Sequence, residues 1–462
     1  MNGRFLHIQE SKRLIISVSF YFLFHLSYGQ TDLKALLDLA GRNYPSIAAK
    51  QAEAEAAKTT VSLEKNSLLP SLDASYQANY ATYNNITGMT YPGQVMPISG
   101  PPSDDNYGAV PGSAASLLFK WSPVTFGQRS AAIAYNEMQY EKQLASVEDE
   151  VLKVKFKVAY LYLEMAATEQ LINAWQKNIE RNAFNLKQVS SLVSAGLRPA
   201  VDSLKFKGEL SKAKTQLFEL QNLLESQKQQ MQELLVSENL QDIEISPFFF
   251  SALPHSPDDR PDMDSTMNPL LKMAELDLKA NQARLKQINR SWTPKLEFWG
   301  TTYARGSGIS FNGTVDKAEG WSFSRYNYGL GLQMTFPLLD LPQVRLQGNR
   351  QEALIRSAEQ YLRQTKISVG RQETTAMNEL STSLHIAAEV PVEYKASESA
   401  YRALQARYHS GLVDYTELIR AQYDLLNAEA RLKNASVRAW QSLLKLAIVR
   451  GDVSIFLNQI EN

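Results

Sequence analysis

YHSGLVDYTELIRAQYDLLNAEARL, residues 408–432, opens with a glycine turn and continues as a strongly helical stretch without further glycine or proline. SAGLRPAVDSLKFKGEL, residues 194–210, opens in much the same way. A glycine that ends one helix permits the left-handed backbone conformation that reverses the chain, and an antiparallel helix can then start at the following leucine, Leu197 or Leu412. Each stretch therefore predicts the tip of a helical hairpin, although the two glycines taken alone are only helix caps.

The segments around these turns are long and contain few helix breakers. Residues 130–195 contain neither glycine nor proline, and at ~1.5 Å per residue a helix of this length would extend about 100 Å. Residues 201–246, 349–410 and 412–450 are further predicted helices. Pro391 is expected to kink or break the helix that contains it. Apolar residues at helical spacing in the last segment predict coiled-coil-like packing.

An internal repeat organises the chain. Pro45 and Pro269 each precede a run without glycine or proline, and both runs end at a second proline after the same interval. The two glycine turns are separated by nearly the same distance in sequence as these two prolines. The sequence therefore predicts two repeats, residues 30–246 and 269–462, each in the order helix, strand, strand, helix, helix, with a proline-rich linker over residues 247–268.

Four segments with an alternating pattern are predicted β-strands, namely residues 72–83, 114–122, 296–305 and 327–336. Apolar side chains fall on one face of these strands and polar ones on the other, with the third strand the least regular. Long loops rich in glycine, proline and asparagine, residues 84–112 and 306–325, connect the strands of each pair. Such pairs fit outer-membrane hairpins, and a soluble hairpin with one half-buried face is the alternative.

The amino terminus carries the pattern of a secretory signal. Arg4, Lys12 and Arg13 precede the mostly apolar residues 14–26, and the small residues Ser27 and Gly29 form a cleavage pattern. Residues 1–29 are therefore a predicted signal peptide, since the apolar run is too short to span a bilayer as a helix. No later run of apolar residues reaches the length of a transmembrane helix.

Composition excludes several classes of protein. The 48 Lys and Arg residues are balanced by 48 Asp and Glu residues. We therefore expect no nucleic acid as a partner, because proteins that bind nucleic acid carry a basic surface. Cysteine is absent from the sequence, which excludes disulfides, thiolate metal sites and a lipoprotein anchored at a cysteine. The five histidines are dispersed, without a metal-binding pair at helical spacing. We therefore expect no enzyme, no cofactor and no metal site.

The number of strands constrains any membrane-spanning assembly. An open strand edge cannot stand in hydrocarbon, where no water satisfies the backbone, so four strands must be closed by other copies. Two copies would give an eight-stranded barrel, and side chains nearly fill the interior of a barrel of that size. Three copies would give a twelve-stranded barrel with room for a lumen. A conduit therefore implies at least a homotrimer.

These features together resemble the TolC-type outer membrane factors over essentially the whole mature chain. The resemblance rests on the duplicated order of elements, the Leu-Pro-x-Leu pattern at residues 69–72 and the Gly-Leu turns, and most of all on Gly411-Leu412-Val413 followed by residues 420–424, RAQYD. It implies a mainly α fold with a transmembrane β-barrel part. Three protomers would build a 12-stranded β-barrel on a long periplasmic α-helical barrel.

The resemblance also implies a function and partners. The protein would lie in the outer membrane, in contact with its lipid, with its helices in the periplasm. It would be the passive exit duct of a tripartite efflux system for small molecules (drugs, metals or metabolites), docked to a periplasmic adaptor and driven by an inner-membrane transporter. The exit duct of a type I protein secretion system and an exported soluble helical scaffold remain alternatives.

Site residues follow from the resemblance where positions match. The predicted adaptor-docking tips are Ala195, Gly196, Leu197, Ser410, Gly411 and Leu412, and the predicted periplasmic gate residues are Asp202, Tyr408, Glu417 and Arg420. A latch at the gate would join Asp202 to Tyr408. Val413 and Arg420 depart from the family, which has an arginine and an acid there. Three copies of Glu417 would favour cation binding, unless Arg420 pairs with it and cancels the field; a solvated helix face is the alternative reading of this pair.

Overall fold

A computed structural model describes residues 33–82, 107–237, 243, 245–257 and 268–460. The predicted signal peptide, most of the loop 84–112 and part of the linker 247–268 lie outside these residues. The chain divides into two compact units. The helical unit comprises Met1–Ala52, Leu144–Met273 and Arg363–Asn462, and the sheet unit comprises Glu53–Gln143 and Ala274–Leu362.

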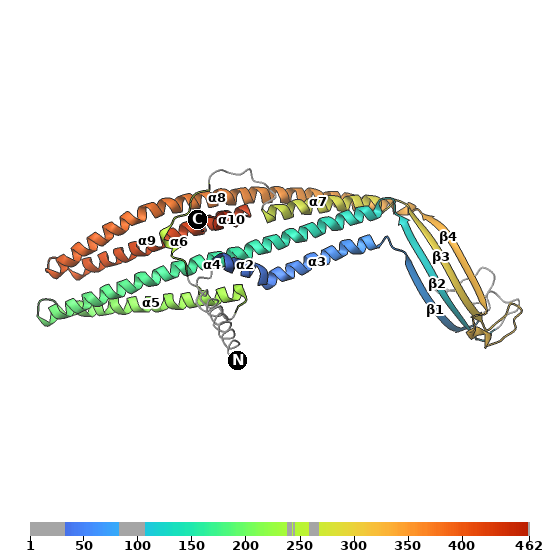
Figure 1. The fold of residues 1–462 in the computed structure, drawn as a ribbon, viewed down its shortest axis with the longest axis horizontal. Coiled ribbons are helices and arrows are strands. Elements are labelled where there is room, and N and C mark those ends of the chain that lie inside the picture. The colour runs from blue at the N-terminus through green and yellow to red at the C-terminus, as the bar shows by residue number, and fades with distance from the viewer. Residues whose placement is uncertain (1–32, 83–106, 238–242, 244, 258–267, 461–462) are drawn as a thin grey trace, which may run out of the picture. The chain divides into compact units, whose positions relative to one another are not determined.

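The sheet unit contains four antiparallel strands, β1 (Ser71–Ala81), β2 (Val110–Val124), β3 (Lys295–Ser307) and β4 (Arg325–Thr335). Their order in space is their order in the chain, as Figure 1 shows. The central pairing, in which Ser116 lies opposite Tyr303, joins a strand from each half of the sequence. Among the described strands, β1 and β4 each leave one edge unpaired.

One face of this sheet is apolar and exposed. The register puts Leu72 opposite Phe119 and Phe298 opposite Leu332, so their side chains lie on a common face. The larger exposed members of this face are Leu72, Tyr76, Tyr80, Leu117, Phe119, Trp121, Phe298, Tyr326, Tyr328, Leu330, Leu332 and Met334. A contiguous apolar surface of this kind marks a lipid or protein contact.

The opposite face of the sheet has a polar character, with Asp73, Gln77, Thr301 and Gln333 among its residues. It also carries the indole of Trp299, which lies against Gly329 and Gly331 of β4. A Cβ added at Gly331 would come within 2.4 Å of Trp299 Cε2, so this position accepts no larger residue while the ring stays in place.

Helices α3 (Pro45–Asn66) and α7 (Pro269–Arg290) lead into strands β1 and β3. At the first junction the guanidinium of Arg129 donates to the carbonyl oxygens of Ser122 and Ser67, at 2.7 and 3.0 Å. At the second, the side-chain amide of Gln128 donates to the carbonyl of Thr293 at 2.8 Å. These bonds tie both helix-to-strand connections to the start of α4 (Gln128–Ser194).

The helical unit is built around two hairpins. α4 turns into α5 (Ala200–Leu235), and α8 (Leu341–His409) turns into α9 (Tyr415–Arg450), as Figure 1 shows. The remaining helices are short: α2 (Leu33–Asn43), α6 (Phe248–Ser251), α10 (Ser454–Leu457) and the 3-10 turns η1 (Glu319–Trp321) and η2 (Leu338–Asp340) of the sheet unit. None of the described helices combines the length and the apolar character that a membrane-spanning helix needs.

An aromatic cluster forms the main core of the helical unit. Trp440 of α9 is 1% exposed and packs against Phe248, Phe249 and Phe456, with ring centroids 5.3–6.0 Å apart. Its indole N–H donates to the carbonyl of Ala252 at 3.0 Å, which satisfies the one polar atom of the ring. The cluster thereby holds α6 and α10 against α9.

Several helices differ from the prediction. α5 ends at Leu235, well before the predicted residue 246, and α8 begins at Leu341, before the predicted residue 349. α8 continues through Pro391 without a break. α5 begins at Ala200, within one residue of the predicted segment 201–246 but after Leu197, because Pro199 disfavours helical backbone at the residue before it. α9 begins at Tyr415 rather than at Leu412, because the carboxylate of Asp414 caps it by accepting the backbone N–H of Glu417 at 3.0 Å.

Candidate gate at the hairpin tips

The two hairpin turns have the same backbone structure. Gly196 and Gly411 have φ angles of 72° and 77°, which confirms the predicted left-handed conformation. The N–H of each glycine donates to the carbonyl three residues back, and the N–H of the next leucine donates to the carbonyl five residues back. This pattern satisfies the free carbonyls at the end of a helix and reverses the chain.

The six residues predicted to dock an adaptor are all exposed at these turns: Ala195, Gly196, Leu197, Ser410, Gly411 and Leu412. Leu197 and Leu412 are 70% and 69% exposed, so each tip presents one large apolar side chain to its surroundings. A Cβ at either glycine would meet nothing within 4 Å, and the positive φ alone disfavours other residues there. The role of the tips in docking stays a prediction.

Tyr408 and Asp202 are in contact across the two hairpins. The hydroxyl of Tyr408 donates to Asp202 Oδ2 at 3.2 Å, and the two residues are 0% and 8% exposed. The ring of Phe206 packs edge-on against Tyr408, with centroids 6.1 Å apart. Burial, together with the charge and the hydrogen bond of Asp202, raises the pKa of Tyr408 to about 12, against a smaller lowering by Arg198. The tyrosine therefore remains a hydrogen-bond donor throughout the physiological range of pH.

Arg198 contacts the same tyrosine and was missed by sequence reasoning. It lies in the first turn, yet its Nη2 donates to the carbonyl oxygens of Tyr408 at 2.5 Å and Val413 at 3.4 Å in the second turn. Its guanidinium carbon lies 4.4 Å from the centroid of the Tyr408 ring. One signal was available: Arg198 and Val413 both stand two residues after a turn glycine, and the family arginine was expected at the second of these positions.

Glu417 and Arg420 are both exposed on α9. The described residues include no ion pair between them, so the pairing considered from their spacing is not formed. An exposed pair of this spacing gains little, since solvent screens both charges. Glu417 stands at the position that corresponds to Asp202, six residues after its glycine, but among the described residues its carboxylate forms no hydrogen bond or ion pair with the other hairpin.

A second tyrosine–carboxylate contact lies further along the hairpins. The hydroxyl of Tyr423 donates to Glu209 Oε2 at 2.5 Å, and Lys212 contacts the other oxygen at 2.9 Å. Burial and then the hydrogen bond and charge of Glu209 raise the pKa of Tyr423 to about 12. Burial raises the pKa of Glu209, but hydrogen bonds from Lys212 and Tyr423 outweigh it and leave this pKa lowered.

A buried polar seam follows between α4, α8 and α9. Asn185 donates to Tyr401 and to Gln422 at 3.1 and 3.2 Å, and Gln422 donates to Asn178 Oδ1 at 2.9 Å. Further along α9, Glu429 is 3% exposed and accepts two bonds from Arg181 at 3.1 Å. Amide groups buried in this way fix the register of the helices, because a slip would leave them without partners.

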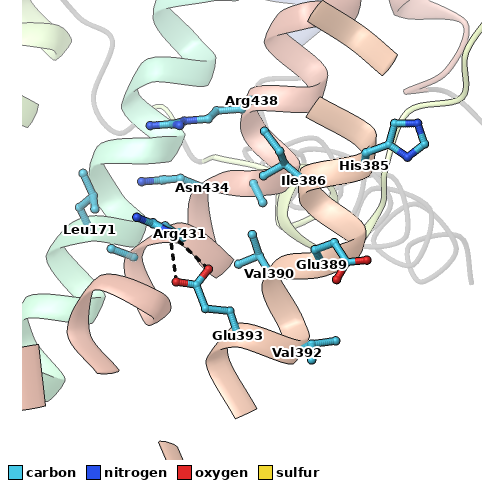
Figure 2. A pocket seen from close by; sticks show the side chains of 12 residues that line it. Leu171, His385, Ile386, Glu389, Val390, Val392, Glu393, Arg431, Asn434 and Arg438 are labelled. Carbon is cyan, nitrogen blue, oxygen red and sulfur yellow. Dashed lines mark hydrogen bonds and ion pairs between the residues drawn. The ribbon is translucent and has the colours of Figure 1, made fainter. Parts of the chain in front are cut away.

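A cavity of ≈ 900 Å³ lies among α4, α8 and α9, beside Pro391. Figure 2 shows its apolar residues, Leu171, Ile386, Val390 and Val392, and the ion pair of Arg431 with Glu393 at 3.1 Å. It contains none of the predicted gate residues. Within the described part of the chain, no three His, Cys, Asp or Glu side chains gather as metal ligands would.

Long helical hairpins, an exposed apolar strand face and paired glycine tips fit the class of outer-membrane channel proteins. Residues 36–236 and 265–451 match the family described as outer membrane efflux protein, and the chain belongs to this family. This is a family of channels located in the outer membrane rather than of enzymes. No curated protein matches the sequence.

Solved structures share the fold. The outer-membrane channel OprN aligns with a TM-score of 0.76 and 16% identity, covering 91% of this chain and 89% of its own. CusC aligns with a TM-score of 0.77 and 12% identity, covering 92% of each chain. The outer membrane protein VceC from Vibrio cholerae aligns with a TM-score of 0.74 and 14% identity, covering 91% of this chain and 96% of its own. At these identities the likeness extends to the fold alone.

Proposed function

We propose that three copies of this chain form the outer-membrane exit duct of a tripartite efflux system. Each copy contributes four strands to a 12-stranded β-barrel and two hairpins to a periplasmic helical barrel. The duct is passive, and an inner-membrane transporter drives small molecules through it with the help of a periplasmic adaptor.

The unpaired edges of β1 and β4 carry this proposal. The exposed apolar face of the same strands suits contact with lipid, but hydrocarbon offers no water to the backbone groups of an open edge. Pairing β4 of one copy with β1 of the next removes both edges, and three copies are the smallest ring with room for a lumen. The polar face of the sheet then lines the passage.

The hairpin tips are the proposed entrance and docking site. The contact between Tyr408 and Asp202 is the latch of the closed entrance, and three copies of Glu417 ring its mouth. Arg420 is available to oppose that charge without neutralising it in a fixed pair. The exposed apolar tips at Leu197 and Leu412 are the surface on which a helical hairpin of the adaptor packs, with the small turn residues allowing close approach.

The decisive experiment is to extract the mature chain from membranes with detergent, determine its mass, and record its conductance in a planar bilayer. A detergent-dependent trimer with small currents that cations block is the expected result. A water-soluble monomer or dimer without conductance would refute the duct. Glu417→Ala should leave the trimer intact and weaken the block by cations. Glu398→Ala, which removes a partly exposed acid of α8 that pairs with Arg402, is the control and should leave the block unchanged.

A further inference from the structure

The duplicated turns differ in the side chains that follow them. Arg198 and Asp202 stand two and six residues after the first glycine, and Val413 and Glu417 hold the same places after the second. Both charged groups of the first hairpin contact Tyr408 of the second. The reverse contacts do not exist among the described residues, because Val413 has no charge and Glu417 is exposed.

Arg198 contacts two backbone carbonyls and one aromatic ring of the second tip. Nη2 lies 2.5 Å from the carbonyl oxygen of Tyr408 and 3.4 Å from that of Val413, and the guanidinium lies over the tyrosine ring. The carbonyl of Tyr408 belongs to the last turn of α8 and also accepts the N–H of Gly411 at 3.1 Å. A cation at the carboxyl end of a helix is favourable, since free carbonyls concentrate negative charge there.

The arginine and the aspartate constrain Tyr408 at opposite ends. Asp202 accepts the hydroxyl hydrogen at the far end of the side chain, and Arg198 binds the backbone at the near end and lies over the ring between them. The tyrosine is fully buried, so its position is set by these contacts and by the packing of Phe206. Removing the aspartate contact alone would still leave the second tip attached through its backbone.

We propose that Arg198 is a positioning residue that clasps the tip of the α8–α9 hairpin onto the α4–α5 hairpin, and that the entrance opens only when this clasp releases. The inference rests on the proposed function for its second half, since a clasp controls an entrance only where the tips form one. The first half concerns contacts within a single copy. The clasp is independent of the Tyr408 hydroxyl, because it binds backbone and ring.

A distance measurement tests the clasp without reference to transport. The sequence has no cysteine, so cysteines introduced at the exposed Leu197 and Leu412 accept spin labels at these two sites alone. Labelled chains diluted with unlabelled ones in the full detergent-solubilised protein report the distance between the tips of one copy. Arg198→Ala should broaden this distance distribution, with about a tenfold gain in separated tips, as the loss of a charge-assisted hydrogen bond implies.

Matched variants separate the clasp from general damage. Arg198→Lys keeps a donor for one carbonyl but loses the planar stacking, so it should broaden the distribution less than Arg198→Ala. Arg402→Ala removes an exposed arginine of α8 that pairs only with Glu398 among the described residues, and it should change nothing. A distribution for Arg198→Ala that equals the unsubstituted one, while Asp202→Ala broadens it, would overturn the clasp.

Conductance measured on the same variants tests the second half. An increase in conductance for Arg198→Ala, with none for Arg402→Ala, supports a clasp that holds the entrance closed. Broadened distances without any change in conductance would leave the clasp standing but refute the entrance at the tips. That outcome separates a failure of the proposed function from a failure of the clasp itself.

Discussion

Replacing Tyr408 by Phe removes one hydrogen-bond donor and leaves the ring in place. The hydroxyl is the side chain's only link to Asp202 Oδ2, at 3.2 Å, and both residues are buried. A hydrogen bond to a charged group contributes about 1.5–3 kcal/mol, so its loss should favour separated tips by roughly one to two orders of magnitude. The ring contacts with Phe206 and Arg198 remain, and the fold should therefore persist.

Single-channel conductance of the reconstituted protein measures this change as more frequent and longer openings. Tyr415→Phe is a close control, because its ring packs against the same Phe206 at 4.9 Å while its hydroxyl bonds to none of the described residues. Openings that increase equally in both variants would show that the effect comes from packing. Openings unchanged in Tyr408→Phe would refute the latch.

A pH titration tests the contact between Tyr408 and Asp202 without a substitution. The pKa of Tyr408 is raised from its usual 10.0 to about 12, first by burial and then by Asp202. A group whose pKa is raised on folding contributes stability that is fully present below the unfolded value and is lost as pH rises through the folded value. The latch should therefore hold up to about pH 10 and weaken between about pH 10 and 12. Tyr408→Phe should remove the part of this alkaline opening that belongs to the latch.

Three further substitutions test the packing on which the duct depends. Gly331→Ala should lower the melting temperature of the assembly, because its methyl group would meet the indole of Trp299, and adding Trp299→Ala should restore part of the loss. Gly370→Ala, at an open position inside α8, should instead stabilise by about 1 kcal/mol through helix propensity, and a lowered melting temperature would show that another chain approaches there. Glu429→Ala should cost about 2–3 kcal/mol in denaturant unfolding, because it leaves the guanidinium of Arg181, whose side chain is 20% exposed, without its carboxylate. Glu393→Ala, in an exposed pair, should cost about 1 kcal/mol or less.

The sequence predicts local structure well where one physical rule decides it. Positive φ follows from a glycine between two helical segments, and both turns obey it. The alternation of apolar and polar residues also predicts the strands, and the strand register places the apolar side chains on one face of the sheet. The early end of α5 was not predictable, because no proline or glycine marks it and Val236 itself takes the left-handed conformation.

Contacts between distant residues were predictable only through resemblance. Residue types alone do not pair Tyr408 with Asp202, which stand 206 positions apart, and the structure brings them together where the family pattern suggested. Arg198 was missed because its hydrogen-bond partners are backbone carbonyls, which no residue type marks, and the one available signal was its place two residues after the first turn glycine. The seam of Asn178, Asn185 and Gln422 escaped for another reason: amides on a long helix look like solvated positions until a second helix covers them.

Pro391 shows how tertiary structure overrides a local rule. Proline removes one backbone donor and its ring crowds the preceding turn, which favours a kink or a break. α8 nevertheless runs to His409, because its buried side chains pack with α9 on both sides of the proline: Val390 shares an apolar cluster with Ala435, and Tyr401 shares another with Leu425. The cavity beside it lies where the helices pack less closely.

The order of polar contacts along α9 suggests where the hairpins part most easily. The contacts at Tyr408 and Val413 lie just before its first residue, Tyr415, and Gln422 and Glu429 follow about 10 and 20 Å further along the axis at ~1.5 Å per residue. Arg198 is half-buried, whereas Gln422 and Glu429 are 4% and 3% exposed, so separation costs more unsatisfied polar groups with each step away from the tip. Opening should therefore stop at the buried polar seam of Gln422 and Glu429. Spin-label pairs placed beyond Glu429, on the side away from the tips, should keep their distances in Arg198→Ala. A change in the distances between spin labels beyond Glu429 in that variant would show that the hairpins rotate as rigid bodies instead.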